Sequence, residues 1–234
     1  MLENTEREFL QNYNPDKYEK PAVSVDIVLF SVSNGERESY RRLPEKSLSI
    51  LLVKRDILPF KDTHSLPGGF IKMTETLDES AARVLSSETG LQDIYLEQLY
   101  TFSDIDRDPR MRVISTSYMA LVDKDKVGQI NLEAKWVNFD SVMENEDTLA
   151  FDHSKIIDMA YNRLKNKLEY SDIVFNLMPE EFTLRELQQV YEIILQKKLL
   201  DPAFRRIIAN KVEGTGRYRK SGGHRPSELF IKKE

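Results

Sequence analysis

Residues 69–91 read GFIKMTETLDESAARVLSSETGL, a segment with a glycine at its start and another near its end. Within it, residues 77–89 predict a helix, because Gly90 provides a stop signal directly after them. Glu75 lies near the expected start of that helix. The segment therefore predicts a glycine-led loop that runs into a helix.

This segment resembles the Nudix box, whose pattern is glycine, five residues, glutamate, seven residues, and then Arg-Glu-apolar-x-Glu-Glu-x-Gly-apolar. Seven anchors stand at the expected spacings: Gly69, Glu75, Arg83, Leu85, Glu88, Gly90 and Leu91. Two positions differ, because Val84 and Ser87 stand where the family places glutamates. The resemblance implies a Nudix fold in which Glu75 and Arg83 form a structural ion pair.

The two substitutions fall on one face of the predicted helix, because residues 84, 87 and 88 lie at i, i+3 and i+4. Three carboxylates on this face, as in active members of the family, can hold Mg²⁺ against a diphosphate and orient a water. Glu88 alone is a poor magnesium site, since Mg²⁺ demands near-octahedral oxygen ligands. The resemblance therefore implies a Nudix pocket without confident catalytic residues, with Glu88 as the remaining carboxylate.

Composition limits the class of protein. The 234 residues allow one large or two small domains, and 40% apolar residues are enough for a packed core. The absence of cysteine excludes disulfides, thiolate zinc sites and cysteine nucleophiles. No apolar run approaches the roughly 18 residues of a membrane span, and the N-terminus lacks a signal-peptide pattern. We expect a cytoplasmic protein with no membrane partner.

Charge is distributed unevenly along the chain. Residues 196–234 contain eleven Lys or Arg and four acidic residues, so they carry +7, whereas residues 1–195 carry −12. A basic end on an acidic body favours an anionic partner for that end, although a merely solvated basic tail would have the same composition.

The N-terminal part of the chain predicts an α/β fold. Five segments favour strands: 22–32, 47–55, 94–103, 113–122 and 134–138. The predicted Nudix helix interrupts them and no regular βαβ repeat is present, so we expect a mixed-sheet α/β/α sandwich. A helix over 154–168 would complete it, placing the Nudix-like domain at residues 1–168 and the second domain at 169–234.

Arginines mark the candidate ligand site. The charged turn 104–112 is similar to a stretch of Nudix-related regulators and ADP-ribose-type hydrolases. Its arginines could meet phosphate or sugar oxygens, or it could be a solvated Asp-Pro turn with local salt bridges. The candidate effector-binding residues are Arg55, Arg107, Arg110 and Arg112. His153 is tempting as a base, but its position favours a helix-start or packing role.

The C-terminal part predicts a helix-turn-helix. Thr183 and Glu186 form a capping-box pattern that opens a helix to about residue 196. Asp201 as N-cap and Pro202 at the first helical position start a second helix, expected to reach about residue 211. Its apolar face would be Phe204, Ile207 and Ile208, with Arg205, Arg206, Ala209 and Asn210 opposite.

The last segment, 212–231, has two strand-like pieces around a glycine-rich basic tip, which suits the wing of a winged helix. Lysines and arginines there would neutralise DNA phosphates, while the second helix would contact base edges. The candidate DNA-binding residues are Arg205, Arg206, Asn210, Arg217, Arg219, Lys220 and Arg225.

Together the two parts resemble the Nudix-related transcriptional regulator family, called NrtR-like. The resemblance covers about residues 15–232 and includes Tyr18-Glu-Lys-Pro21, Leu66-Pro-Gly-Gly-Phe-Ile71, Arg107-Asp-Pro-Arg110, Leu149-Ala-Phe-Asp-His153 and Phe182-Thr-Leu-Arg-Glu-Leu187. It implies a homodimer that binds a double-stranded DNA operator and responds to ADP-ribose or a sugar. Such regulators control genes of NAD metabolism or sugar use.

Two functions remain as alternatives. The first is a ligand-responsive transcriptional regulator that needs no metal cofactor. The second is a Mg²⁺-dependent hydrolase of ADP-ribose or a related nucleoside diphosphate derivative, in which Glu88 and an acid from 104–108 would hold the ion. Val84 and Ser87 are the residues that argue against the hydrolase. A protein-binding adaptor is a further, weaker alternative.

Overall fold

The computed structural model describes residues 2–35, 44–220 and 226–233. Within these residues, the largest unit is a seven-stranded mixed sheet in which β1 pairs in parallel with β6 and antiparallel with β2 and β4. The strands are β1 (Ala22–Asn34), β2 (Lys46–Lys54), β3 (His64–Ser65), β4 (Gly68–Phe70), β5 (Glu97–Phe102), β6 (Val113–Leu121) and β7 (Ala134–Asn138). All five predicted strands are present, with ends shifted by three residues at most.

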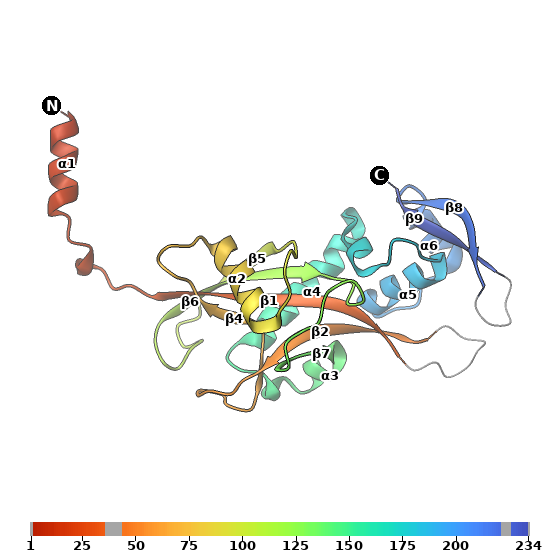
Figure 1. The fold of residues 1–234 in the computed structure, drawn as a ribbon, viewed down its shortest axis with the longest axis horizontal. Helices are drawn as coiled ribbons and strands as arrows, with labels where there is room; N and C mark the ends of the chain where they lie inside the picture. Colours follow the sequence, from red (N-terminus) through yellow and green to blue (C-terminus); the bar gives the residue numbers. More distant parts are fainter. Residues whose placement is uncertain (1, 36–43, 221–225, 234) are drawn as a thin grey trace.

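Helices cover both faces of this sheet, which confirms the predicted α/β/α sandwich (Figure 1). α2 (Leu77–Thr89) packs on one face, and α3 (Phe139–Glu144) and α4 (His153–Tyr170) pack on the other. Alternate residues of a strand point to opposite sides of the sheet, so the run of consecutive buried residues in β1 shows that both of its faces are covered. This explains why its sequence is a continuous apolar run rather than an alternating one.

The C-terminal part is a winged helix, as predicted. It consists of α5 (Leu184–Leu195), α6 (Asp201–Ile208), β8 (Val212–Arg219) and β9 (Ser227–Lys232). β8 and β9 pair antiparallel. The tip of their hairpin, 221–225, lies outside the described residues, and so does the predicted DNA contact Arg225.

The helix ends differ in part from the prediction. The Thr183–Glu186 capping box is present in full at the start of α5. Asp201 is not the N-cap of α6: Leu200 takes that position with an extended backbone, and Asp201 is the first helical residue. An acidic residue in the first turn still favours the helix dipole. α6 ends at Ile208, short of the predicted 211, because the chain turns there into β8.

One apolar cluster joins the sandwich to the winged helix. It begins under α4 with Val28 and Phe30 of β1 and continues without a break to Ile194 of α5 and Phe204 of α6. The connection from α4 to α5 contains a short 3-10 helix, η3 (Ile173–Leu177), whose apolar residues are buried in the same cluster. The two units are therefore packed on each other.

The remaining elements lie outside this cluster. α1 (Leu2–Asn12) projects away from the body in Figure 1 and is followed by the short helix η1 (Pro15–Lys17). Another 3-10 turn, η2 (Glu146–Thr148), follows α3. Among the described residues, no helix is both long enough and apolar enough to cross a membrane.

Gly68 offers a test of how tightly the Nudix-box loop packs. A Cβ atom at this position would lie 2.4 Å from Oδ1 of Asp26 and 3.1 Å from the carbonyl oxygen of Val25. Gly68→Ala should therefore lower the free energy of unfolding by about 1–3 kcal/mol, the usual cost of overpacking. Gly128→Ala is the matched control, because a Cβ there meets nothing within 4 Å. Urea denaturation that found the two variants equally stable would contradict this packing.

Candidate ligand pocket and DNA-binding surface

The structural residues of the Nudix box lie where the resemblance places them. Arg83 donates to both carboxylate oxygens of Glu75, at 2.8 and 2.5 Å, so loop and helix are braced as expected. This bidentate contact lowers the pKa of Glu75 to about 2. Gly90 caps α2 with a φ of 80°, a left-handed conformation that favours glycine. Gly69 lies against Val84, whose methyl group occupies the space a side chain at 69 would need.

The face expected to hold metal in active relatives has different chemistry here. Val84 is 2% exposed and belongs to the apolar cluster between α2 and the sheet. Ser87 is exposed and donates to the carbonyl oxygen of Val84. Glu88 lines the central cavity described below, and burial followed by the nearby Asp56 raises its pKa. Only one of the three positions therefore presents a carboxylate.

These residues do not fit a magnesium site of the Nudix kind. Mg²⁺ needs several oxygen ligands in near-octahedral arrangement. In the described part of the chain, no group of three or more His, Cys, Asp or Glu side chains could hold a metal ion. Glu88 with Asp56 as its neighbour falls short of that donor set.

A cavity of about 270 Å³ opens beside Glu88 between the sheet and the loops around it. We call it the central cavity. Three of the four arginines predicted to bind an effector line it, whereas Arg112 does not reach it and instead donates to the carbonyl oxygen of Asp104 at 2.8 Å. The charged and aromatic side chains of its lining are Asp26, Arg55, Asp56, Phe70, Glu88, Arg107, Asp108, Arg110, Phe151 and His153.

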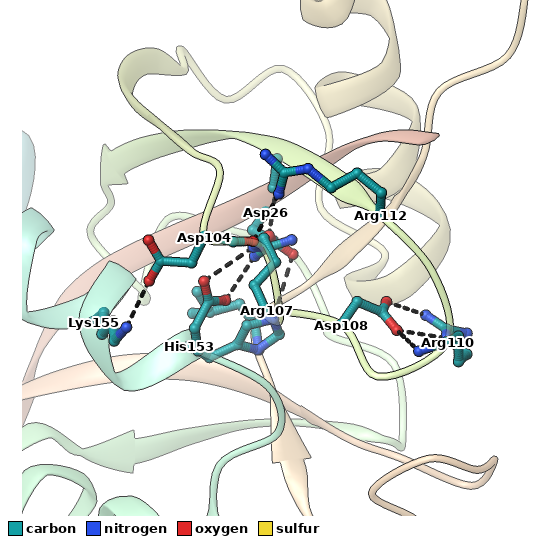
Figure 2. A network of polar contacts seen from close by, with 11 residues as sticks. Asp26, Asp104, Arg107, Asp108, Arg110, Arg112, His153 and Lys155 are labelled. Carbon is teal, nitrogen blue, oxygen red and sulfur yellow. Dashed lines mark hydrogen bonds and ion pairs between the residues drawn. The ribbon is translucent and has the colours of Figure 1, made fainter. Parts of the chain in front are cut away.

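A buried ion cluster forms the floor of the central cavity (Figure 2). Arg107, from the loop after β5, donates to Asp152 at 3.0 and 2.7 Å and to Asp26 of β1 at 3.2 Å. Asp26 also accepts from Ser115 of β6 at 2.5 Å. Three separate segments thus meet at the guanidinium of Arg107, and these contacts fix Arg107 as part of the floor of the cavity.

The contacts in this floor determine the pKa of Asp26 and the position of the ring proton on His153. Burial alone would raise the pKa of Asp26, but His153, Ser115 and Arg107 outweigh burial and lower it to about 2. His153 accepts a hydrogen bond at Nδ1 from the backbone N–H of Leu66, at 2.9 Å. The ring proton of the neutral form therefore sits on Nε2, 3.5 Å from Asp26. His153 is the first residue of α4 and is buried, which confirms the predicted position at a helix start.

One wall of the central cavity is a stack of arginines and phenylalanines. Arg55 and Arg110 lie over the ring of Phe151 at 4.9 and 5.6 Å, and Arg110 also lies 5.6 Å from the ring of Phe70. Phe60 packs edge-on against Phe151 at 4.8 Å. Burial, and next the charge of Arg110, lowers the pKa of Arg55. Two crowded cations beside planar rings favour a ligand that is anionic and has a flat group.

Sequence reasoning missed several of these residues. Phe70 and Phe151 gave no signal of their own, since single phenylalanines next to predicted elements usually belong to the core. Asp26 did give a signal, because it is the one charge in a strand otherwise suited to burial. A buried aspartate needs a partner, yet the sequence could not say that the partner is Arg107.

α6, the proposed recognition helix, has a basic outer surface. Arg205 and Arg206 are exposed, and neither forms an ion pair with any described residue. Asn210 is exposed too, but it lies in the turn after α6, so its predicted place on this helix is wrong. Ile207 was assigned to the buried face, and this is wrong: it is 46% exposed, whereas Phe204 and Ile208 are each 1% exposed. Two apolar residues suffice to anchor this short helix.

Glu192 of α5 fixes where α6 begins. Its side chain is buried and accepts from the backbone N–H of Leu199 at 3.0 Å, from Gln188 at 3.1 Å and from Lys198 at 3.1 Å. Gln188 also donates to the carbonyl oxygen of Leu199. These contacts close the turn between α5 and α6, so the orientation of α6 is set from α5.

The wing arginines are engaged within the chain. Arg219 donates to Glu186 at 2.9 Å and to the carbonyl oxygen of Glu181 at 3.0 Å. Arg217 forms an ion pair with Glu181. Both predicted DNA contacts thus brace the wing against the start of α5, whereas Lys220 is exposed beyond them and forms no ion pair with a described residue.

These features define a class of protein in which a Nudix-type ligand pocket is joined to a DNA-binding winged helix. The NUDIX domain family matches residues 20–160, and the NrtR DNA-binding winged helix domain matches residues 174–231. The ADPR responsive transcriptional repressor NtrR of Acinetobacter baylyi is 36% identical over 97% of this chain and 88% of its own length. The chain belongs to the NrtR family of Nudix-related transcriptional regulators.

Two further relatives are similar. A crystal structure of Shewanella oneidensis NrtR complexed with a 27mer DNA covers 90% of this chain and 93% of its own, with 33% identity and a TM-score of 0.74. Its NUDIX domain complexed with ADP ribose covers 68% of this chain and 98% of its own, with 32% identity and a TM-score of 0.55. An ADP-ribose pyrophosphatase of Methanocaldococcus jannaschii is 39% identical over 64% of this chain and 78% of its own.

The buried floor predicts a specific pH dependence. Because the folded-state pKa of Asp26 is about 2, below its ordinary 3.8, its stabilisation is present above about pH 4 and is lost as the pH falls toward 2. We expect the free energy of unfolding of the wild type to fall by about 2 kcal/mol more than that of Asp26→Asn over this range. Asp104→Asn, at an exposed ion pair, should behave like the wild type. Parallel acid profiles for wild type and Asp26→Asn would refute the assignment.

Proposed function

We propose that this chain is a transcriptional repressor that binds operator DNA through its winged helix and releases it when ADP-ribose occupies the central cavity. The observation that carries the proposal is the union, in one packed body, of a Nudix pocket lacking two metal carboxylates with a helix whose outer surface is basic. The names of the Acinetobacter and Shewanella relatives, with their ADP-ribose and DNA, support the same assignment.

The chemistry of the central cavity suits ADP-ribose. The diphosphate would lie near Arg55 and Arg110, where its negative charge would relieve the repulsion between the two cations. The adenine or a ribose would pack on the phenylalanines of the same wall, since planar groups stack well on aromatic rings and guanidinium planes. Arg110 is paired with Asp108 at 2.8 Å, whereas Arg55 forms no ion pair with a described residue, so a diphosphate would give Arg55 the anionic partner that a neutral sugar lacks.

α4 supplies a physical route between the two sites. Its first residue, His153, holds Leu66 of the Nudix-box loop, and the preceding Asp152 holds Arg107. Further along α4, the Tyr161 hydroxyl donates to the carbonyl oxygen of Ile194 in α5 at 2.9 Å. A ligand that shifts the floor of the central cavity would therefore shift α5, and through Glu192 the start of α6.

We further propose that the protein acts as a homodimer. Two winged helices at a fixed separation would match two half-sites of a palindromic operator, and a small change in that separation would weaken binding. A DNA-binding regulator acts in the compartment that contains the chromosome, so we propose that the protein is cytoplasmic.

Saturating ADP-ribose should weaken binding to the protein's own upstream DNA by about tenfold or more, within the usual range of allosteric coupling. Fluorescence anisotropy at about physiological salt measures this, with a panel of free sugars as comparison ligands.

Arg55→Ala should keep its DNA affinity and lose the response, because it changes only the central cavity. Arg206→Ala should lose specific DNA binding and keep ADP-ribose binding. An operator affinity that neither ADP-ribose nor any sugar changes would contradict a ligand-responsive regulator.

We also propose that bound ADP-ribose is not hydrolysed. The expected result is no AMP release above background with excess Mg²⁺, because Glu88 lacks the two partner carboxylates. Glu88→Gln is the control, since turnover that survives it would come from a contaminant. Turnover that Glu88→Gln abolishes would overturn this proposal and favour the hydrolase.

A further inference from the structure

We infer that Ile207 reads a thymine in the operator through the thymine 5-methyl group. The inference rests on the DNA binding proposed above and adds a base preference to it. It starts from a residue that the sequence pattern assigned to the core and that the structure places on the surface of α6.

The exposure of Ile207 is specific to its place on the helix. A lone exposed isoleucine is ordinary on a protein surface, but here the other two branched or aromatic apolar residues of α6 are 1% exposed and Ile207 is 46% exposed. Ala203, four residues earlier and therefore on the same side of α6, is also exposed. Its methyl side chain is too small to cover Ile207, so an aliphatic surface remains open toward the partner of α6.

The geometry of α6 aims this surface at base edges. Successive helical residues are about 100° apart. Arg206 therefore points away from the side buried by Phe204 and Ile208, and Arg205 and Ile207 flank it on either side. When Arg206 points into the major groove, Arg205 faces one side of the groove and Ile207 the other. The two flanks differ chemically, with one cationic and one apolar.

Thymine is the base that an apolar flank can recognise. In the major groove the edges of guanine, adenine and cytosine present hydrogen-bond donors and acceptors, whereas thymine also presents a 5-methyl group. Against any other base, Ile207 would cover a polar edge without pairing it, which costs affinity. Burial of one methyl group corresponds to about fourfold in affinity.

The test removes that methyl group alone. A preferred sequence is first selected from a random duplex pool with the full-length protein, and each thymine is then replaced singly by deoxyuridine. Wild-type protein should lose about fourfold in affinity at one thymine of each half-site and little elsewhere. Ile207→Ala should bind the thymine sequence more weakly and show no further loss with deoxyuridine. Leu132→Ala, which removes a fully exposed aliphatic side chain outside the winged helix, should keep the wild-type pattern.

The outcomes separate the inference from the function beneath it. If no thymine is sensitive in the wild type, or if the sensitivity persists in Ile207→Ala, the assignment of Ile207 is overturned while DNA binding stands. If selection enriches no sequence, the proposed DNA-binding function fails and the inference with it. Unchanged ADP-ribose binding by Ile207→Ala shows that the variant is folded, so its loss of the methyl effect would support the inference.

Discussion

The structure depends on one buried guanidinium. Arg107 is shared by Asp26 from the centre of the sheet and Asp152 from the start of α4, so a strand, a loop and a helix converge on it. Removing one partner of such a cluster leaves an uncompensated buried charge, which costs about 3–5 kcal/mol. The same contacts form the floor of the central cavity and tie that floor to the start of α4.

This arrangement suits a sensor better than a catalyst. In a Nudix hydrolase the carboxylates of the helix bind metal ions, whereas here Val84 packs in the apolar core, and Asp152 and Asp108 accept hydrogen bonds from Arg107 and Arg110. The wall formed by Arg55, Arg110, Phe70 and Phe151 is cationic and aromatic, which is suited to holding an anionic nucleotide. A single apolar cluster runs from β1 to α6, so packed side chains connect the sheet that carries the cavity with the DNA-binding helix.

Local signals in the sequence were enough for much of the fold. The Nudix helix, its glycine stop, the Thr183–Glu186 capping box and the strands follow from spacing and residue type within a few positions. The cavity could not be predicted in this way, because the partners of Arg107 lie 45 and 81 residues away along the chain. The orientation of α6 was equally hidden, since Phe204, Ile207 and Ile208 are all apolar and only tertiary packing decides which are buried. The wing arginines look alike in sequence whether they meet DNA or glutamates.

The central claim is that the central cavity and the winged helix form one coupled unit, and reciprocity tests it most directly. Calorimetry would compare the affinity of ADP-ribose for the free protein with its affinity for the protein saturated with operator DNA. Thermodynamic linkage requires the DNA-bound form to bind ADP-ribose more weakly, by the same factor as ADP-ribose weakens DNA binding. Equal affinities for the two forms would contradict the coupling, however well each ligand binds alone.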